Sequence, residues 1–471
     1  MPSFDDARAI LFALIAVGTP GCAARTSQPS SPAAPPPAAS RANTPPATPV
    51  PLPQDVPETP AGHQLTWVLA SMNSVPAEAD IATHFSAAFL AQVPLAKLVE
   101  TAGRVAQGAP YVLENVGPSE GSGRMLVARV RSSQGKSFNV RLLLERDGDR
   151  IEGLLIRPHI DAKVAASWSE VAETLRGVAP SVSFLAAEIQ GKSCVSTSGI
   201  NPRNALALGS TFNLYVLDAL AAQVASRKHT WDDPIAIDDA LKSLPSGEMQ
   251  DAPAGKTFTV RHFAEQMISV SDNTAADHLL AFVGRAAVEA AVATSGHANP
   301  SSLVPFPSTR EMFALKLLTS SDERNAYLAA DVAHKRKLLD AYAKRDPPEM
   351  PARSSSFKTP TMIDALEWFA SPEDLCKLVA DLHARAIVTT TAPVGAILSM
   401  NPGFPDDKKQ YRYIGFKGGS EPGVLNMTFL LRRARDDKWL FLTVGFNDTN
   451  APIDEPKALA AVVTAREFFG R

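Results

Sequence analysis

Strand-like segments on both sides of a long helical stretch constrain the fold of residues 166–471 more than any other feature. The stretch from about residue 230 to residue 400 is helical in pattern, with loop-like breaks at residues 298–310 and 346–360. The flanking segments with strand character are residues 181–190, 193–198, 412–417, 423–433 and 438–447. Because strands bury their apolar faces within one packed domain, these distant segments are expected to form a single sheet. Further helices are expected at residues 167–176, 211–227 and 456–469.

Residues 62–163 show a different pattern, which predicts a separate small α+β domain. Helical periodicity covers residues 64–72 and 81–105, with a break near Pro94. Four strand-like runs follow, at residues 111–116, 124–132, 137–146 and 150–158, with turn residues between them. Helices followed by an antiparallel meander predict a cone-shaped, cystatin-like or steroid-isomerase-like domain. No cluster of acidic, basic and aromatic residues marks a catalytic pocket here, so the pattern favours a structural or docking role.

The first 60 residues carry a targeting signal and a linker. Residues 10–18 form an apolar run too short to span a bilayer, and residues 1–22 together resemble a secretory signal peptide. The Gly-Cys pair that ends it indicates a lipoprotein, with Cys22 as the lipidated residue. Residues 23–60 are rich in proline, alanine and serine, which favours an extended linker. The sequence therefore predicts an exported protein of the cell envelope, lipid-anchored to a bacterial membrane.

Composition excludes several classes of function. A chain of 471 residues predicts two or three domains. With a net charge of −3 the chain has no overall positive potential that would attract the phosphates of a nucleic acid, so no nucleic-acid partner is expected. The nine histidines lack metal-binding spacing, and neither a metal nor a cofactor is expected. Cys194 and Cys376 fit either two small buried side chains or one disulfide. The sequence carries no signal for an oligomeric state.

Three short motifs occur in a fixed order in the second half of the chain. They are Ser210-Thr211-Phe212-Asn213, Ser271-Asp272-Asn273 and Lys417-Gly418-Gly419, within the stretches LGSTFNLYVL, MISVSDNTAADHLL and IGFKGGSEPGV. The ordered set resembles the penicillin-recognising serine hydrolases, closest to class A β-lactamases. With the small N-terminal domain, the chain resembles the two-domain form found in the clavulanic-acid biosynthetic cluster. The resemblance implies an α+β, β-lactamase-like domain over residues 166–471.

The resemblance assigns the chemistry to three residues. Ser210, near the N-terminus of a helix, would be the nucleophile, and a serine hydroxyl needs a nearby base to react. Ser271 would relay a proton to the leaving group. Lys417 would place positive charge beside Ser271 and attract a substrate carboxylate.

Other residues of the motifs would hold the substrate or the site itself. The backbone N–H groups of Ser210 and Ser420 would form the oxyanion hole, next to Gly419 on the edge strand. Asn273 would bind a substrate amide, and Asp272 would hold its loop. These residues were expected to act around a small-molecule or peptidoglycan-like substrate.

The sequence also departs from the family pattern. The family has lysine where this chain has Asn213, and a neutral amide cannot accept the proton of Ser210. Gly418 lacks a hydroxyl that commonly helps to hold a substrate carboxylate. No Glu-x-x-Leu-Asn segment is present to position a deacylating water. Glu311, Glu323 and Glu367 are candidates by position alone, and each fits a solvated or structural glutamate better.

These departures leave three functions open. The first is a serine hydrolase acylated at Ser210 that acts slowly on an ester, amide or β-lactam. The second is a catalytically inactive protein whose pocket binds peptidoglycan-like or β-lactam-like ligands, with Asn213 as a polar remnant. The third is an envelope scaffold in which the N-terminal domain docks a partner. Loss of a general base removes on the order of 10²–10⁴-fold in rate, so efficient β-lactam hydrolysis is not expected.

Overall fold

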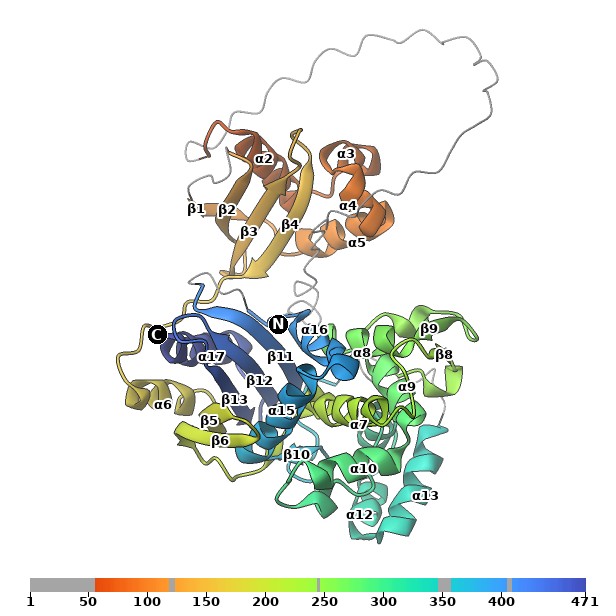
Figure 1. Ribbon diagram of the computed structural model, residues 1–471. Helices are drawn as coiled ribbons and strands as arrows, with labels where there is room; N and C mark the ends of the chain where they lie inside the picture. Colours follow the sequence, from red (N-terminus) through yellow and green to blue (C-terminus); the bar gives the residue numbers. More distant parts are fainter. Residues whose placement is uncertain (1–55, 118–122, 244–245, 346–356, 405–408) are drawn as a thin grey trace. The chain divides into compact units, whose positions relative to one another are not determined.

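A computed structural model describes residues 56–117, 123–243, 246–345, 357–404 and 409–471 (Figure 1). The chain forms two compact units, here called unit 1 and unit 2. The boundary in the sequence lies between His159 and Ile160. The expected signal peptide, Cys22 and the linker up to residue 55 lie outside the described residues. No helix among the described residues combines the length and the apolar character needed to cross a membrane.

Unit 1 is a four-stranded antiparallel sheet with helices packed on one face. The strands follow chain order, β1 (Val112–Val116), β2 (Met125–Arg131), β3 (Ser137–Leu144) and β4 (Ile151–Pro158). Helix α2 (Pro60–Asn73) packs on this sheet. Alternate residues of β2 and β3 face the helices, and the opposite face leaves Val112, Val127 and Leu143 exposed. The α+β meander predicted from the sequence is confirmed.

The helical segment expected at residues 81–105, with its break near Pro94, has one further interruption in the structure. The structure has three short helices there, α3 (Glu78–His84), α4 (Ala87–Gln92) and α5 (Leu95–Ala106). The first interruption lies at Phe85 and Ser86, where Phe85 forms a bridge with Ile151 of β4 and the Ser86 side chain caps α4. The second lies before Pro94, because the residue preceding a proline is sterically disfavoured in helical conformation.

Unit 2 is built around one five-stranded antiparallel sheet. Its strand order is β11 (Tyr411–Glu421), β12 (Val424–Arg433), β13 (Trp439–Asn447), β5 (Ser181–Gln190) and β6 (Ser193–Ile200). Strands from the two ends of the domain meet where β13 pairs with β5, Leu442 opposite Ala186. The single sheet expected from the sequence is therefore confirmed. Strand β11 runs four residues beyond the expected end at residue 417, and thus contains the whole third motif.

Helices cover both faces of this sheet (Figure 1). Helices α6 (Trp168–Arg176) and α17 (Glu455–Gly470) pack on one face, against side chains such as Phe184 and Leu442. The other face packs on the helical middle of the chain through side chains such as Leu185 and Phe441. Neighbouring residues of one strand thus enter different cores, as the two-residue period of a strand requires.

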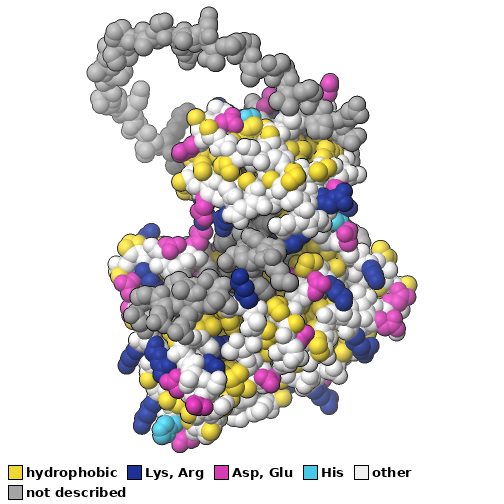
Figure 2. Space-filling model, turned by 180° about the vertical axis from the view of Figure 1, so that it is seen from behind, with side chains coloured by type: hydrophobic (Ala, Val, Ile, Leu, Met, Phe, Trp, Pro, Cys, Tyr) yellow, Lys and Arg dark blue, Asp and Glu magenta, His cyan; other side chains and the backbone are white. Residues whose placement is uncertain are grey.

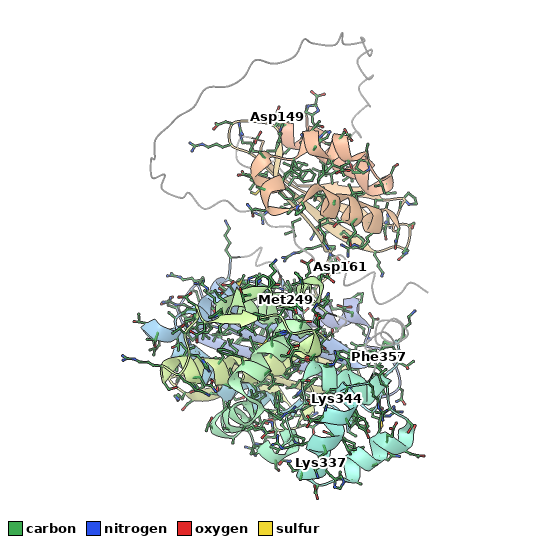
Figure 3. All side chains as sticks on the ribbon, turned by 90° about the vertical axis from the view of Figure 1, so that its right-hand side faces the viewer. Asp149, Asp161, Met249, Lys337, Lys344 and Phe357 are labelled. Atoms are coloured by element: carbon green, nitrogen blue, oxygen red, sulfur yellow. A yellow bond between two sulfur atoms is a disulfide. The ribbon has the colours of Figure 1, made fainter. Side chains whose placement is uncertain are left out.

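The helical middle surrounds one largely buried helix. Ten of the thirteen residues of α7 (Asn213–Ala225) are buried, which marks it as the central helix of the core. Around it lie α8 (Val260–Ser269), α9 (Asn273–Val283), α10 (Arg285–Thr294), α11 (Thr309–Leu317), α12 (Ser321–Ala329), α13 (Val332–Ala343), α15 (Pro372–Ala386) and α16 (Pro393–Ser399). Helix α13 buries Leu339 and leaves Lys337 exposed, and Lys344 directly after the helix is exposed as well (Figure 3).

Two short strand pairs were not expected from the sequence. Strand β7 (Leu206–Ala207) pairs with β10 (Phe369–Ala370), and β8 (Pro234–Ala236) pairs with β9 (Thr257–Thr259). Segments of two or three residues carry no detectable periodicity. The first pair matters for the site, because it joins the segment before Ser210 to residues far along the chain.

The surface of the described residues carries both signs of charge. On the face shown in Figure 2, lysine and arginine side chains alternate with aspartate and glutamate side chains. Ion pairs among the described residues include Lys192 with Asp381 and Lys438 with Glu188. Exposed pairs of this kind contribute little to stability.

Cys194 of β6 and Cys376 of α15 form a disulfide across 182 residues of sequence. Of the two possibilities that the sequence left open, the structure therefore has the disulfide. The bond ties the outer strand of the sheet to a helix of the core in unit 2. A cross-link over so long a loop restricts the unfolded chain strongly.

Replacing both cysteines by serine is expected to lower the free energy of unfolding of unit 2 by about 2–4 kcal/mol. Urea unfolding followed by tryptophan fluorescence measures this, since Trp168, Trp231, Trp368 and Trp439 lie in unit 2. Dithiothreitol should destabilise the wild-type protein and leave the double-serine variant unchanged. An equal response of both proteins to dithiothreitol would contradict the expectation.

Candidate active site

Ser210 lies in a tight turn directly before the central helix. The turn is a 3₁₀ helix, η1 (Gly209–Phe212), and α7 follows at Asn213. Gly209 has φ +52°, a left-handed conformation that glycine adopts without steric cost. Ser210 is half-buried while its neighbours are buried. The turn therefore presents the serine at the N-terminal end of a buried helix, where developing negative charge is stabilised.

Strand β11 packs directly against this turn through Gly419. A Cβ atom added to Gly419 would lie 2.1 Å from the carbonyl oxygen of Leu208 and 2.6 Å from the backbone nitrogen of Ser210. A Cβ added to Gly209 would lie 2.7 Å from the backbone nitrogen of Ser420. Two glycines thus allow the two backbones to touch. The contact brings together the backbone nitrogens of Ser210 and Ser420, the pair expected to form an oxyanion hole.

Buried hydrogen bonds hold the turn on the sheet, and the sequence did not indicate them. Thr211 Oγ1 donates to Asn426 Oδ1 (3.0 Å), and Asn426 Oδ1 also accepts from Thr428 Oγ1 (2.9 Å). Thr428 in turn contacts Thr443 on the next strand (2.8 Å between hydroxyls). These residues alternate with apolar ones along β12 and β13. A polar residue inside a buried strand run is the only sequence signal that could have revealed them.

The second and third motifs meet through one hydrogen bond. Lys417 Nζ lies 2.7 Å from Ser271 Oγ and 2.6 Å from the carbonyl oxygen of Gly418. Lys417 is only 2% exposed, so a solvated lysine at the end of a strand is excluded. Ser271 has φ +61°, which is unusual for a residue with a side chain. Strained backbone of this kind gathers at functional sites, and here it accompanies the contact of the Ser271 hydroxyl with Lys417.

Asp272 organises the loops around the second motif. One of its carboxylate oxygens caps α9 by accepting the N–H of Ala275 (2.8 Å). The other accepts the N–H groups of Glu248 (2.7 Å) and Met249 (2.9 Å). Burial nevertheless raises the pKa of Asp272, against the lowering effect of these N–H donors.

Gly247 lets the loop that carries Glu248 and Met249 approach the second motif closely. It has φ +101°, and an added Cβ would lie 2.0 Å from Asp272 Oδ2. Asn273, the first residue of α9, is 3% exposed and donates its backbone N–H to the carbonyl of Ser246 (3.0 Å).

Asn213 occupies the position one turn after Ser210 and is completely buried. Its side-chain nitrogen donates a long hydrogen bond to the carbonyl of Met267 (3.4 Å). Its Oδ1 has no hydrogen-bond partner among the described residues. Leaving a buried acceptor unpaired costs about 1–3 kcal/mol. The surroundings of Asn213 therefore lack a hydrogen-bond donor for its side-chain oxygen among the described residues.

A buried charge cluster lies next to the turn that carries Ser210. Lys316 Nζ contacts Glu367 Oε1 (3.0 Å) and Glu421 Oε1 (2.5 Å). Glu367 also accepts the N–H of Gly209 (3.3 Å), the residue before Ser210. The side chains of Lys316, Glu367 and Glu421 are 0%, 1% and 8% exposed.

The protonation of this cluster follows from its burial. Desolvation raises the pKa of Glu421 well above its ordinary value of 4.5; Lys316 opposes the shift and Glu367 adds to it. Desolvation by itself would lower the pKa of Lys316, but the two carboxylates raise it overall. The cluster is therefore one cation shared by two carboxyl groups, of which Glu421 is the one that tends to keep its proton.

The three glutamates considered for deacylation have structural partners. Glu311 binds Arg285 through both oxygens (2.6 and 2.9 Å) and caps α11. Glu323 pairs with Arg345 and caps α12. Glu367 alone reaches the turn that carries Ser210, where it binds backbone. Sequence reasoning named Glu367 only by position and missed Lys316 and Glu421. Among the described residues, no group of three or more histidine, cysteine or acidic side chains could hold a metal ion.

Gly419→Ala is expected to destabilise unit 2 by about 1–3 kcal/mol, because its methyl group would overlap backbone that cannot move independently. Gly418→Ala is the matched control. There an added Cβ would first meet the ring of Phe416, at 2.9 Å, and a ring can rotate away. Urea unfolding of both variants measures the difference. Equal stability of the two variants would show that β11 does not depend on close contact at residue 419.

Glu421→Gln is expected to change how stability depends on pH. Folding raises the pKa of Glu421. Its contribution to the free energy of unfolding is therefore fully present below about pH 4.5 and is lost as the pH rises through the pKa of the folded state. The free energy of unfolding of the wild-type protein should therefore fall faster above pH 4.5 than that of the variant. The difference in slope is at most about 1.4 kcal/mol per pH unit.

Glu323→Gln is the contrasting control. Its hydrogen bond with Arg345 lowers the pKa of Glu323 to about 2, so its stabilising effect is lost in acid instead, between its unfolded and folded pKa values. Urea unfolding between pH 3 and pH 9 gives the free energy of unfolding of both variants and so distinguishes the effect of Glu421→Gln from that of Glu323→Gln. The same pH profile for both variants would contradict the assignment.

Two parts of the chain match models of protein families. Residues 168–391 match the beta-lactamase enzyme family, a range that includes the first two motifs and ends before the third. Residues 56–149 match the N-terminal region of the ORF 12 gene product. No curated protein sequence matches the chain significantly.

Solved structures of beta-lactamases are similar to the chain at low sequence identity. The beta-lactamase from Sphaerobacter thermophilus is 19% identical, with a TM-score of 0.45, over 64% of this chain and 98% of its own. The putative class A beta-lactamase PenP from Rhodopseudomonas palustris is 16% identical, with a TM-score of 0.44, over 64% of this chain and 98% of its own. PBP-A is 12% identical, with a TM-score of 0.42, over 66% of this chain and 99% of its own.

The family match and the observed sheet, central helix and motif contacts agree with one another. Residues 168–391 are therefore similar in sequence to the beta-lactamase enzyme family, and unit 2 has a mixed α/β fold of the beta-lactamase type.

Proposed function

We propose that the protein is a slow serine hydrolase that forms an acyl-enzyme at Ser210 with an ester, amide or β-lactam. The observation that carries the proposal is the 2.7 Å contact between Lys417 Nζ and Ser271 Oγ. Lys417 belongs to the strand that packs on the turn that carries Ser210. A protein without catalytic chemistry has no need to bury a lysine against a serine hydroxyl held in strained backbone.

Each residue of the site has its own role in the proposed acylation. The Ser210 oxygen attacks the substrate carbonyl, and its proton passes to the Ser271 hydroxyl as Ser271 passes its own proton to neutral Lys417. The backbone N–H groups of Ser210 and Ser420 stabilise the oxyanion. When the carbonyl reforms, the bond to the leaving oxygen or nitrogen breaks, and Lys417 returns the proton through Ser271. Lys417 acts only through Ser271 and only when it is neutral, so acylation is expected to be slow.

Hydrolysis of the acyl-enzyme is expected to be slower still. Glu367, which binds the backbone of the turn, already accepts hydrogen bonds from Lys316 and from the backbone N–H groups of Gly209 and Trp368. It therefore has little capacity left to activate a water. An acyl group that carries a carboxylate would also be attracted by Lys417. Small molecules or peptidoglycan-like fragments with both a carbonyl and a carboxylate fit these features.

One observation favours a second candidate function, in which the site binds such ligands without turnover. Asn213 is neutral, buried and unpaired at Oδ1, at the position where the family has lysine. In that case the oxyanion hole and Lys417 would bind the ligand, and Ser210 would not react. For either function we propose an exported protein, lipid-anchored through Cys22 at a bacterial envelope, where peptidoglycan-like ligands occur.

Incubation with a fluorophosphonate and, separately, with a fluorescent penicillin is expected to add the mass of one acyl or phosphonyl group to the wild-type protein. Ser210→Ala should remove the mass shift, since it deletes the nucleophile. Asn213→Lys should raise the labelling rate by on the order of 10²-fold or more, because it restores a general base. Intact-protein mass spectrometry against time measures all three proteins.

The controls separate the two candidate functions. Wild-type labelling that depends on Ser210 and falls in Lys417→Met supports the hydrolase. Labelling that appears only in Asn213→Lys supports ligand binding by a disarmed site. Absence of labelling in every variant, with normal circular dichroism, would rule out acyl transfer at Ser210.

A further inference from the structure

Lys316 of α11 binds both of the segments that carry the backbone nitrogens of the expected oxyanion hole. Its ammonium group lies 3.0 Å from Glu367 Oε1 and 2.5 Å from Glu421 Oε1. Glu367 contacts the turn that carries Ser210, and Glu421 is the last residue of β11, directly after Ser420. One side chain from a third element therefore connects the two halves of the site.

On the Ser210 side, the connection runs through the carboxylate of Glu367. Its Oε1 binds Lys316, and its Oε2 accepts the backbone N–H of Gly209 (3.3 Å), the residue before Ser210. The same Oε2 accepts the backbone N–H of Trp368 (2.9 Å). Because both oxygens have partners, Lys316 fixes the orientation of the carboxylate, and the carboxylate fixes the backbone that leads into Ser210.

Trp368 adds a second contact between the Glu367 segment and the turn. Its ring stacks on Phe212, with 3.9 Å between ring centroids and 17° between the ring planes. Its carbonyl oxygen accepts the backbone N–H of Leu208 (2.9 Å). The segment thus contacts residues on both sides of Ser210, so a displacement of Glu367 would also displace the serine.

On the Ser420 side, the connection runs through the end of β11. Glu421 pairs with Val424 at the hairpin to β12, and its side chain is held by Lys316. A movement of this end away from Ser210 would separate Glu421 from Lys316. Breaking a buried ion pair leaves an uncompensated charge in the core, which is strongly unfavourable.

We propose that Lys316 is a positioning residue for acylation at Ser210. It holds the backbone N–H groups of Ser210 and Ser420 at the separation that lets both donate to the oxyanion, and it acts only through Glu367 and Glu421. This inference rests on the proposed acyl transfer, since an oxyanion arises only in that reaction. Preorganised donors of this kind stabilise the transition state, and small errors in their position lower the rate steeply.

Lys316→Met tests the proposal, because it removes the ammonium group and keeps an unbranched side chain. Labelling by the fluorescent penicillin over a range of concentrations gives the maximal rate constant of acylation and the concentration for half-maximal rate. The maximal rate constant should fall at least about tenfold, because the two donors are no longer aligned. The concentration for half-maximal rate should change little, because the donors act in the transition state.

Glu421→Ala is a second variant with a different effect on the buried charges. It breaks the connection on the Ser420 side only and leaves Lys316 paired with Glu367, so the charges stay balanced. It should also lower the maximal rate constant. Circular dichroism identifies the folded variants, and Glu421→Ala decides the test if Lys316→Met does not fold.

Arg285→Met is the matched control. It removes a cation that pairs with Glu311 of α11 (2.6 Å), the helix that also carries Lys316. It should lower the stability of unit 2 and leave the maximal rate constant unchanged. If only Asn213→Lys is labelled, all variants are compared in that background.

Hydrogen–deuterium exchange of the full-length protein gives a second readout that needs no acylation. Peptides that contain Ser210 and Ser420 should exchange faster in Lys316→Met than in the wild-type protein. In Arg285→Met the same peptides should exchange as in the wild-type protein. Mass spectrometry of the peptides measures the exchange.

Two results would overturn the proposal. One is a maximal rate constant equal to that of the wild-type protein in Lys316→Met, or in Glu421→Ala where only that variant folds. The other is an equal loss of rate in Arg285→Met. Failure of the proposed hydrolase is a different result, namely no labelling of either the wild-type protein or Asn213→Lys. Hydrogen exchange then decides: faster exchange confined to Lys316→Met supports the positioning role, and equal exchange in Lys316→Met and Arg285→Met overturns it.

Discussion

The close approach of β11 to the turn at Ser210 is the contact on which unit 2 depends. A strand from the C-terminal part of the chain touches a turn about 200 residues earlier, and only Gly209 and Gly419 make this possible, since either Cβ would overlap backbone. The contact joins the sheet to the central helix. It also sets the positions of the two backbone nitrogens that could receive an oxyanion. The same local geometry therefore serves both packing and chemistry.

Buried polar groups around this contact divide into two kinds. The chain of Thr211, Asn426, Thr428 and Thr443 is fully paired and holds the turn on the sheet. The cluster of Lys316, Glu367 and Glu421 is paired as well, but it places two carboxyl groups around one cation. Such a cluster is weak evidence for stability, because the cost of desolvating its charges offsets their attraction. Its contact with the N–H of Gly209 instead indicates that it positions the turn that carries Ser210.

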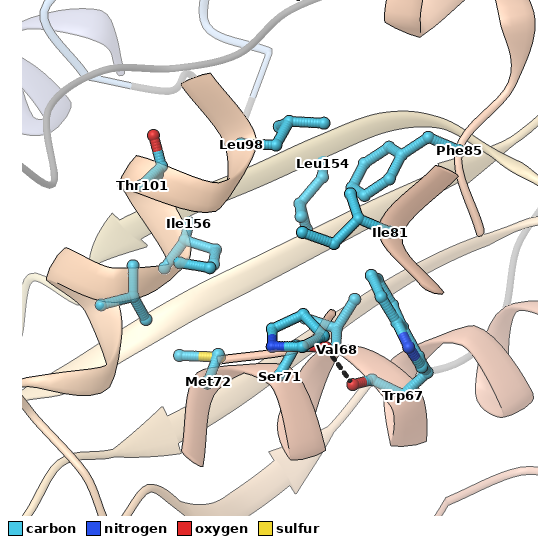
Figure 4. Close-up of a pocket in the computed structure, with 13 residues that line it drawn as sticks. Trp67, Val68, Ser71, Met72, Ile81, Phe85, Leu98, Thr101, Leu154 and Ile156 are labelled. Carbon is cyan, nitrogen blue, oxygen red and sulfur yellow. Dashed lines mark hydrogen bonds between the residues drawn. The ribbon is translucent and has the colours of Figure 1, made fainter. Parts of the chain in front are cut away.

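Buried polar side chains have different kinds of hydrogen-bond partner in unit 1 and in unit 2. In unit 2 the polar side chains of the core bind one another or backbone from distant elements. In unit 1 the hydroxyls of Ser71 and Thr101, which line the pocket in Figure 4, bind the preceding turn of their own helix, so that the space beside them remains apolar.

The sequence by itself determined most of the longer helices and strands, the single sheet from distant strands and the three ordered motifs of unit 2. These features follow from local periodicity and from short motifs, which are properties of neighbouring residues. The sequence also identified Asn213 as the departure from the family pattern. It failed where the decisive partner lies far along the chain: the break of residues 81–105 at the bridge to Ile151, the disulfide, the short strand pairs, and the charge cluster behind Ser210. Only the tertiary structure decided these, because a residue such as Glu421 has an ordinary sequence context and becomes unusual only when folding buries it beside Lys316 and Glu367.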